Sequence, residues 1–445
     1  MLYISCTQKH MTIEDLKVFS IKKVKFSDFA KLILLLASFL LLATALIFYK
    51  TIFILSTPVF SSFWIFYGVV VSVYLISRIP YAYLYEDRHR KYPNSSYPSV
   101  SVVIAAKNEE KSIFKTISKC VESEYPAELE FIIVDDGSTD GTKNEVTRAK
   151  KIYGDKIKLI SFPKHYGKRE AMASGVDEAE NDVIVFVDSD SFLSPNAIRH
   201  ITEHFIADES IGAVAGNTKV ENADTNLLTK MQSVQYAISF DVYKTGESVH
   251  KAVTCCPGCF SAYRKIAIKP LIQKWKEQEF LGVRGTFGDD RGLTNFVLRD
   301  WNVVYCEKAK GATMVPEQFP VYWRQQLRWK KSWIREGILA GAFMWKRHPF
   351  ASIGFYINFS FPFLGPILAL KVLILSVQTG NPALFGVFMV GFILVGMTFA
   401  LFVRIYRGAK NWFYMPLFST LFISTLIWQM IYAFLTLRDS RWGTR

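Results

Sequence analysis

The segment from Phe29 to Tyr49 constrains this chain most, because it holds a single charged residue, Lys31, among apolar and small side chains. A helix of about 20 such residues spans the hydrocarbon core of a bilayer, which is ~30 Å thick. A signal peptide has a shorter apolar region followed by a small-residue cleavage site, whereas a 28-residue polar leader precedes this run. We therefore predict a transmembrane helix.

A second apolar segment runs from Ser61 to Ser77, and basic residues flank the pair of segments on the same side. The four lysines nearest the first segment are Lys17, Lys22, Lys23 and Lys25, three arginines and Lys91 follow the second, and the connection between them carries only Lys50. Positively charged flanks stay in the cytoplasm. The pattern predicts a multi-pass protein of the plasma membrane with both flanks cytoplasmic.

The composition fits a chain divided between membrane and water. Half of the 445 residues are hydrophobic, 21% are charged, and the formal net charge is +14. The basic residues gather at membrane flanks and not in an aromatic-interleaved stripe, so we expect contacts with membrane lipids and no nucleic acid. Six cysteines are too few for a disulfide framework and indicate a reducing, cytoplasmic setting for the domain that carries them.

Between about residues 99 and 316, short apolar runs alternate with helical patterns, which predicts a parallel α/β sheet. The first such runs are Val100 to Ala106, Leu129 to Val134 and Val183 to Val187. Ligands bind at the carboxyl ends of the strands in open α/β sheets. The active site should therefore collect the acidic residues that follow these runs, namely Asp135, Asp136, Asp188 and Asp190.

Basic and apolar residues alternate at helical spacing from Phe319 to Arg347, which predicts one or two amphipathic helices at the membrane surface. Three apolar segments follow, and the first two predict a membrane hairpin. The third contains Pro416 and several polar residues, so we expect a re-entrant or interface helix that leaves the C-terminus in the cytoplasm. The three segments are Ala351 to Val377, Ala383 to Val403 and Trp412 to Leu437.

These patterns divide the chain into six parts. We expect a cytoplasmic leader, two transmembrane helices, a cytoplasmic catalytic domain, interface helices, C-terminal membrane helices and a terminal segment, at residues 1–28, 29–77, 78–316, 317–347, 348–437 and 438–445.

Two acidic motifs follow predicted strands. Asp136 lies in IIVDDGSTDGT, where a carboxylate could accept hydrogen bonds from a nucleoside; a plain turn with Asp140 as helix cap explains the motif equally well. Asp188 and Asp190 lie two residues apart in VIVFVDSDS, and their repulsion favours a hard divalent cation that also binds a diphosphate. The alternative for this second motif is two solvated turn aspartates.

Two further motifs lie nearer the C-terminus. GDDR, residues 288 to 291, begins a helical pattern and could supply a general base, although the helix dipole alone favours acids there. QQLRW, residues 325 to 329, offers Arg328 to a diphosphate and Trp329 to a sugar ring, and a basic aromatic interface helix is the alternative. His200 and His204 have the i, i+4 spacing of a zinc pair but lack a third ligand nearby, so we interpret them and His165 as surface or core histidines.

In this order and between membrane segments, these motifs resemble the processive family 2 glycosyltransferases, which are the cellulose, chitin and hyaluronan synthases, and in particular the bacterial-type hyaluronan synthases. The resemblance extends over nearly the whole chain. The segments that match the family are AAKNEE (105 to 110), GKREA (167 to 171), TNLLTK (225 to 230), FGDDRGLTNF (287 to 296), WRQQLRWKKSWIRE (323 to 336) and WGTR (442 to 445).

The resemblance implies a glycosyltransferase-A (Rossmann-like) domain that elongates a polysaccharide from UDP-sugars and passes it through its own membrane helices. It makes Asp290 the general base and implies Mg²⁺ or Mn²⁺ at Asp188 and Asp190. Acceptor-binding residues would be Cys256, Gly258, Gln325 and Trp329. Donor-binding residues would be Ala106, Glu109, Asp136, Lys168, Asp188, Ser189, Asp190, Arg328, Trp442 and Arg445.

One loop departs from the hyaluronan synthase pattern. Gly258 is followed by Cys259 in CCPGCFSAYR, where those enzymes have a Gly-Pro pair, and the cysteine-rich form is similar to that of chitin-oligosaccharide synthases. We expect polymerisation of UDP-GlcNAc with UDP-GlcA, and a homopolymer of UDP-GlcNAc is the first alternative. A non-processive lipid-linked transferase and a catalytically silent export partner are the others; the oligomeric state is left open, and a monomer is compatible with the sequence.

Overall fold

The computed structural model describes residues 62–85 and 92–439. The predicted transmembrane helix at 29–49 and the terminal WGTR motif, with Trp442 and Arg445, lie outside the described residues. The second predicted membrane segment forms part of helix α2 (Ser62–Leu84), which contains Pro80 near its end.

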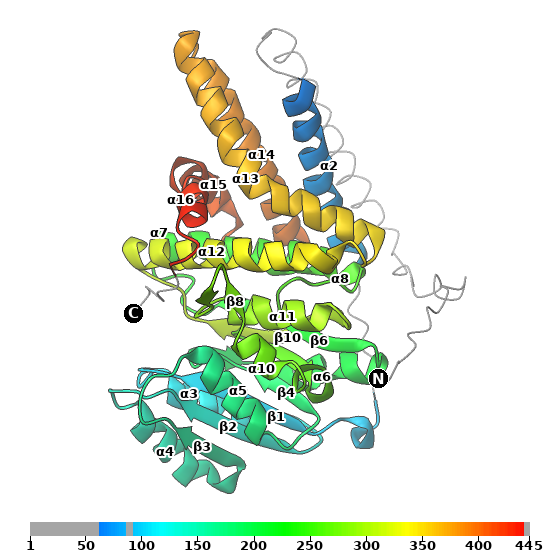
Figure 1. Cartoon of the computed structure of the whole chain (residues 1–445), viewed down its shortest axis with the longest axis vertical. Coiled ribbons are helices and arrows are strands. Elements are labelled where there is room, and N and C mark those ends of the chain that lie inside the picture. The colour runs from blue at the N-terminus through cyan, green and yellow to red at the C-terminus, as the bar shows by residue number, and fades with distance from the viewer. Residues whose placement is uncertain (1–61, 86–91, 440–445) are drawn as a thin grey trace, which may run out of the picture. The chain divides into compact units, whose positions relative to one another are not determined.

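A mixed sheet forms the centre of the described chain (Figure 1). Its eight strands lie in the order β3-β2-β1-β4-β7-β6-β10-β5. The strand bounds are β1 Val100–Ala106, β2 Leu129–Asp135, β3 Ile157–Ser161, β4 Val183–Phe186, β5 Ser191–Leu193, β6 Ile211–Val220, β7 Ser261–Arg264 and β10 Asn302–Thr313, and a separate two-stranded sheet pairs β8 (Glu279–Phe280) with β9 (Val283–Arg284).

Half of this sheet is parallel, as the sequence predicts, and the other half is mixed. Strands β3, β2, β1 and β4 run parallel, whereas β7 runs antiparallel to both β4 and β6, and β5 antiparallel to β10. The loop before β7 lies at the carboxyl edge, where Gly258 approaches Asp188. A strand that begins at that edge must run back against its neighbour, which explains the antiparallel β7.

Both faces of the sheet are covered, so its central parallel strands β1, β2 and β4 are largely apolar. Val103 belongs to the core on one face, and its neighbours Val102 and Ile104 belong to the core on the other. Helices α5 (Lys168–Glu178), α10 (Ile272–Lys276) and α11 (Asp289–Leu298) contribute to the first core, and α3 (Ile113–Val121), α4 (Thr142–Tyr153) and α6 (Ala197–Ala207) to the second.

A second group of helices follows the sheet in sequence. The predicted interface region forms one helix, α12 (Phe319–Met344), which contacts α11 as well as α13 (Pro349–Gln378) and α16 (Gln429–Leu435) (Figure 1). Among the described residues, α13 and α14 (Ala383–Arg407) are each long and apolar enough to cross a membrane. The remaining connecting helices are η2 Asn94–Ser96, η3 Gly154–Lys156, α7 Leu227–Ile238, η4 Ser239–Lys244, α8 Thr245–Val249 and α9 Lys265–Ile268.

The last apolar segment is not one straight helix. It contains η5 (Trp412–Tyr414), α15 (Met415–Leu421), the π-helical turn η6 (Phe422–Leu426) and α16, with a bend of 41° before α16. By length and composition the bent pair is either a broken span or a re-entrant segment. A π-helical turn interrupts regular helical hydrogen bonding, which accounts for a bend at this point.

Gly175 provides a test of the packing between α5 and the sheet. A Cβ atom at this position would lie 2.3 Å from Cγ1 of Val103 in β1. We predict that Gly175→Ala lowers the free energy of unfolding by about 1–3 kcal/mol, because the helix must move away from the strand. Thermal unfolding of the detergent-solubilised protein measures this effect.

Gly386→Ala on α14 is the matched control, since a Cβ there meets no atom within 4 Å. An unfolding midpoint that stays the same in both variants would contradict the close approach of α5 to β1.

Candidate active site

The carboxyl ends of β1, β2 and β4 form one edge of the sheet, and the predicted acidic residues lie along it. Ala106 ends β1, and its carbonyl accepts a hydrogen bond of 2.9 Å from the backbone N–H of Asp136, directly after β2. Asp188, Ser189 and Asp190 lie between β4 and β5. Strand order therefore brings together residues that are about fifty positions apart in the sequence.

The carboxylate of Asp136 holds the loop that leads into α5. It accepts hydrogen bonds from the backbone N–H of Tyr166 at 2.7 Å and of Gly167 at 3.1 Å, and Nδ1 of His165 lies 2.7 Å from Oδ2. No local sequence pattern indicates the His165 contact, because its partner lies 29 residues earlier. A nucleoside at Asp136 would share this carboxylate with the loop.

The two neighbouring loops at this edge are joined by hydrogen bonds. The backbone N–H of Glu109 donates to Oγ1 of Thr142 at 2.7 Å, and Asp140 accepts from the backbone N–H of Thr142 at 3.0 Å. Asp140 thus binds the first residue of α4, as the plain-turn interpretation of this motif expects. The Glu109 carboxylate accepts from Ser112 at 2.9 Å.

Lys168, the first residue of α5, forms an ion pair with Asp188. Burial favours its neutral form, but the charges of Asp188, Asp289 and Asp290 outweigh that effect and raise the pKa of Lys168 above its usual value. A Cβ atom on Gly258 would lie 3.2–3.3 Å from both Asp188 carboxylate oxygens and 3.3 Å from Nζ of Lys168. The predicted acceptor loop therefore passes directly over this ion pair, where a side chain would crowd it.

Asp188 and Asp190 together carry two negative charges, and Lys168 balances one of them. Burial and the neighbouring charge of Asp188 raise the pKa of Asp190 to about 6. Its nearest hydrogen-bond partner is Oγ1 of Thr313, at 3.5 Å. Among residues 62–85 and 92–439, no three His, Cys, Asp or Glu side chains cluster as metal ligands do. Asp188 and Asp190, with Lys168 as the cation beside them, would suit a divalent ion that also binds a diphosphate or water.

The two aspartates of GDDR have different surroundings at the start of α11. Asp289 is buried and accepts from Nε of the buried Arg169 at 3.0 Å. Asp290 instead accepts from Sγ of Cys255 at 3.6 Å and from the backbone N–H of Arg291 at 2.8 Å. The structure therefore separates a structural carboxylate, Asp289, from one without an ion-pair partner in the described chain, Asp290.

The cysteine-rich loop reaches this site through Cys255. Burial, followed by the charge of Asp290, raises the pKa of the Cys255 thiol to about 11, so it acts as a neutral donor. Cys256, a predicted acceptor residue, has a fully buried side chain, and its backbone N–H donates to Oγ1 of Thr294 at 2.8 Å. Its thiol faces the core, and the loop's contact with Asp290 comes from the residue before it.

Helix α12 brings the QQLRW motif to the same site. Burial lowers the pKa of the Arg328 guanidinium, and the charges of Asp289, Asp290 and Asp188 oppose that shift, so Arg328 lies within electrostatic range of all three. Trp329 is 37% exposed, as a stacking platform requires. The side-chain oxygen of Gln325 is buried and has no hydrogen-bond partner in the described part of the chain.

Comparison with known proteins assigns the chain to a family. The model of Glycosyl transferase family 2 matches residues 101–272. A hyaluronan synthase of Streptococcus pyogenes is 31% identical over 418 residues, which cover 90% of this chain and 97% of that protein. The chain belongs to the family 2 glycosyltransferases. An N-acetylglucosaminyltransferase of Azorhizobium caulinodans is also similar, at 29% identity over 78% of this chain and 87% of its own length.

Solved structures agree with the glycosyltransferase-A fold. A mannosyltransferase of Pyrobaculum calidifontis, solved with GDP-Man and Mn²⁺, superimposes with a TM-score of 0.56 at 16% identity and covers 84% of this chain and 99% of its own. At this identity the likeness concerns the fold alone. The α/β glycosyltransferase-A domain and the helical region predicted from the sequence are both confirmed.

The buried ion pairs of this glycosyltransferase provide a second test. Besides Asp289, Arg169 donates to the carbonyl of Trp275 at 2.8 Å and lies 3.9 Å from the buried Glu336. We predict that Arg169→Met lowers the free energy of unfolding by about 3 kcal/mol, because it leaves two carboxylates buried without a cation. The unfolding midpoint in detergent reports this loss.

Arg284→Gln is the control, since Arg284 is 56% exposed and lies 3.7 Å from Glu170. Its effect should stay below about 1 kcal/mol, as for other surface pairs. Equal midpoints for both variants would mean that the Arg169 network does not stabilise the fold.

Proposed function

We propose that this family 2 glycosyltransferase is a processive hyaluronan synthase that polymerises UDP-GlcNAc and UDP-GlcA at the cytoplasmic face of the plasma membrane and passes the polymer across it. The observation that carries the proposal is the extent of the similarity to streptococcal hyaluronan synthase. It covers 97% of that protein and extends well beyond the family 2 segment at residues 101–272.

The side chains around the sheet edge support an inverting displacement. Asp290 takes the proton from the acceptor hydroxyl, a role that suits a carboxylate without an ion-pair partner in the described chain. Arg328 donates hydrogen bonds to the diphosphate of the donor and stabilises the charge that develops on it. Trp329 packs against the acceptor sugar and orients it toward Asp290.

Asp188 and Asp190 would hold Mg²⁺ or Mn²⁺, which would supply positive charge for the departing diphosphate. Lys168 pairs with Asp188 and holds its side chain in place. Ala106, Glu109, Asp136 and Ser189 belong to the same sheet edge and would line the nucleotide, with Trp442 and Arg445 as further proposed contacts. Gln325 and Gly258 would border the acceptor, and Cys255 would do so in place of Cys256, whose thiol faces the core.

A homopolymer synthase that uses UDP-GlcNAc alone is the second candidate. The similarity to N-acetylglucosaminyltransferases and the cysteine-rich loop at residues 255–259 favour it. The two candidates differ in whether the site must accept a carboxylated sugar.

Supplying the donors singly and together to the purified full-length protein distinguishes these candidates. We expect strong UDP release and high-molecular-weight product only when UDP-GlcNAc and UDP-GlcA are both present, because the acceptor end alternates. The product should be digested by hyaluronidase. Polymer formed from UDP-GlcNAc alone, digested by chitinase and resistant to hyaluronidase, would establish the homopolymer synthase instead.

Substitutions at Asp290 and Asp188 test the proposed roles of the carboxylates. We predict that Asp290→Asn lowers turnover by about 10²- to 10⁴-fold, as loss of a general base does, and leaves UDP affinity nearly unchanged. Asp188→Asn should abolish turnover and also weaken Mn²⁺-dependent UDP binding. Wild-type UDP release by Asp290→Asn would remove the base assignment, and unchanged UDP binding by Asp188→Asn would remove the metal assignment.

A further inference from the structure

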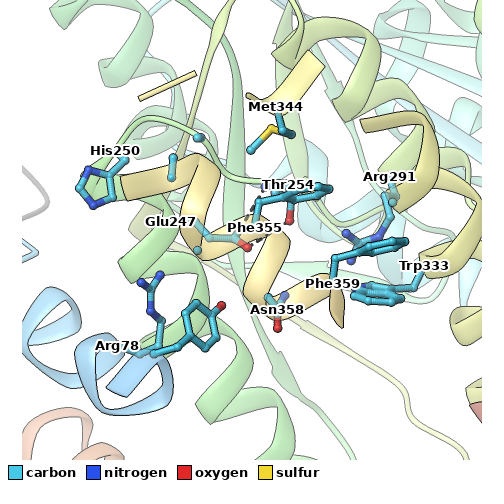
Figure 2. Close-up of a pocket in the computed structure, with 15 residues that line it drawn as sticks. Arg78, Glu247, His250, Thr254, Arg291, Trp333, Met344, Phe355, Asn358 and Phe359 are labelled. Carbon is cyan, nitrogen blue, oxygen red and sulfur yellow. Dashed lines mark hydrogen bonds between the residues drawn. The ribbon is translucent and has the colours of Figure 1, made fainter. Parts of the chain in front are cut away.

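A pocket lies beside the active site, between the end of α2 and helices α8, α11, α12 and α13 (Figure 2). Its lining combines two arginines, Arg78 from α2 and Arg291 from α11, with aromatic side chains of α12 and α13. In Figure 2 the arginines lie on opposite sides of the pocket, with Glu247 between them. The proposed reaction at the sheet edge uses neither arginine.

Arg78 is a buried cation without a carboxylate at ion-pair distance in the described part of the chain. Its side chain is 6% exposed, its hydrogen bonds go to Oγ of Ser77, the nearer at 3.2 Å, and its guanidinium lies 4.6 Å from the ring of Tyr74. Within residues 62–85 and 92–439, neither Arg78 nor Arg291 has a carboxylate at ion-pair distance. A buried charge without a counter-ion is costly, which suits a site that receives an anion.

Among the other titratable groups of the pocket, Glu247 supplies one negative charge against the two arginines. Both oxygens of Glu247 accept hydrogen bonds from Thr254, one from its backbone N–H and one from its hydroxyl, each at 3.0 Å. Burial, with the adjoining His348 and Arg78, lowers the pKa of His250 to about 4, so this imidazole is neutral. The pocket therefore carries a net positive charge.

The aromatic part of the pocket suits a sugar ring. Trp333 stacks on Phe359 with ring centroids 4.9 Å apart, and Phe355 lies parallel to Phe359 at 6.0 Å. The amide of Asn358 adds a donor and an acceptor on the same helix. Trp333 and Phe359 each give one face to the other, so a sugar ring would pack on an outer face of this stack, and the Asn358 amide could bind its hydroxyls.

Three chain connections join this pocket to the active site. Arg291 directly follows Asp290, and Thr254 directly precedes Cys255, whose thiol contacts Asp290. Trp333 lies four residues after Trp329 on α12 and so occupies the same helix face, one turn further. An acceptor chain that left Asp290 along these elements would reach the pocket.

We propose that Arg78 and Arg291 form a carboxylate-binding subsite for the acidic sugar of the acceptor chain, and that they make the enzyme select a carboxylated chain over a neutral one. The proposal rests on the proposed function. It names the residues that would bind the carboxylated polymer in preference to the neutral homopolymer. An anionic lipid headgroup shares the charge but not the fit to the stacked rings of Trp333 and Phe359.

Binding of oligosaccharides to the full-length protein in nanodiscs of neutral lipid tests this subsite. The probes are a hyaluronan hexasaccharide and the uncharged chitin hexasaccharide. We expect the wild type to prefer the carboxylated probe, and Arg78→Gln to reduce that preference about tenfold, as loss of a charge-assisted hydrogen bond does. Arg78→Lys should restore part of the preference, and Arg291→Gln should act in the same direction as Arg78→Gln.

Arg148→Gln is the control, because Arg148 is 54% exposed on α4 and pairs with Glu145. The subsite is overturned if the wild type binds both probes equally, or if the preference survives in Arg78→Gln and Arg291→Gln. An effect of these variants that appears only in nanodiscs of anionic lipid would assign the arginines to a headgroup and also overturn it. The polymer made by the wild type tests the proposed function separately, since a hyaluronan product with an unchanged preference in the variants contradicts the subsite alone.

Discussion

Charge balance between two adjacent cations and the surrounding carboxylates determines how this active site is built. Lys168 and Arg169 are consecutive at the start of α5 and face different partners. Lys168 binds Asp188 at the sheet edge, and Arg169 binds Asp289 in the interior. Since one helix end fixes both, the donor side and the acceptor side of the site share one anchor, and the buried pair sets the position of α11 and hence of Asp290.

The sequence predicts the parallel half of the sheet and the gathering of its acidic residues well, for a physical reason. Strands buried on both faces must be apolar throughout, so Val100 to Ala106 and Val183 to Val187 are recognisable by composition alone. The antiparallel β7 was not predicted, because its direction depends on where the loop before it lies and not on its four residues. The interface region, expected as one or two helices, is the single continuous helix α12.

Contacts between distant side chains were beyond the reach of the sequence. The GDDR motif offered two equivalent aspartates, and only the fold shows that Arg169, 120 residues earlier, pairs with Asp289. His165 has no local pattern that links it to Asp136. Likewise, only the fold shows that the Cys255 thiol contacts Asp290 while the Cys256 thiol faces the core. Sequence motifs predicted segments that the fold brings together at one sheet edge, and three-dimensional packing gives neighbouring residues within them different contacts.

The continuity of α12 has a mechanical consequence. This single helix carries Arg328 and Trp329 at the active site and Trp333 in the adjoining pocket, while Lys330 donates to Gln429 of α16 at 2.8 Å. An α-helix resists changes of length, with a fixed rise of about 1.5 Å per residue. Any tilt or shift of the apolar helices that is transmitted through Gln429 therefore displaces Arg328, Trp329 and Trp333 together. In the proposed membrane enzyme, bilayer thickness and lateral pressure would thus act on the rate of sugar transfer through this one helix.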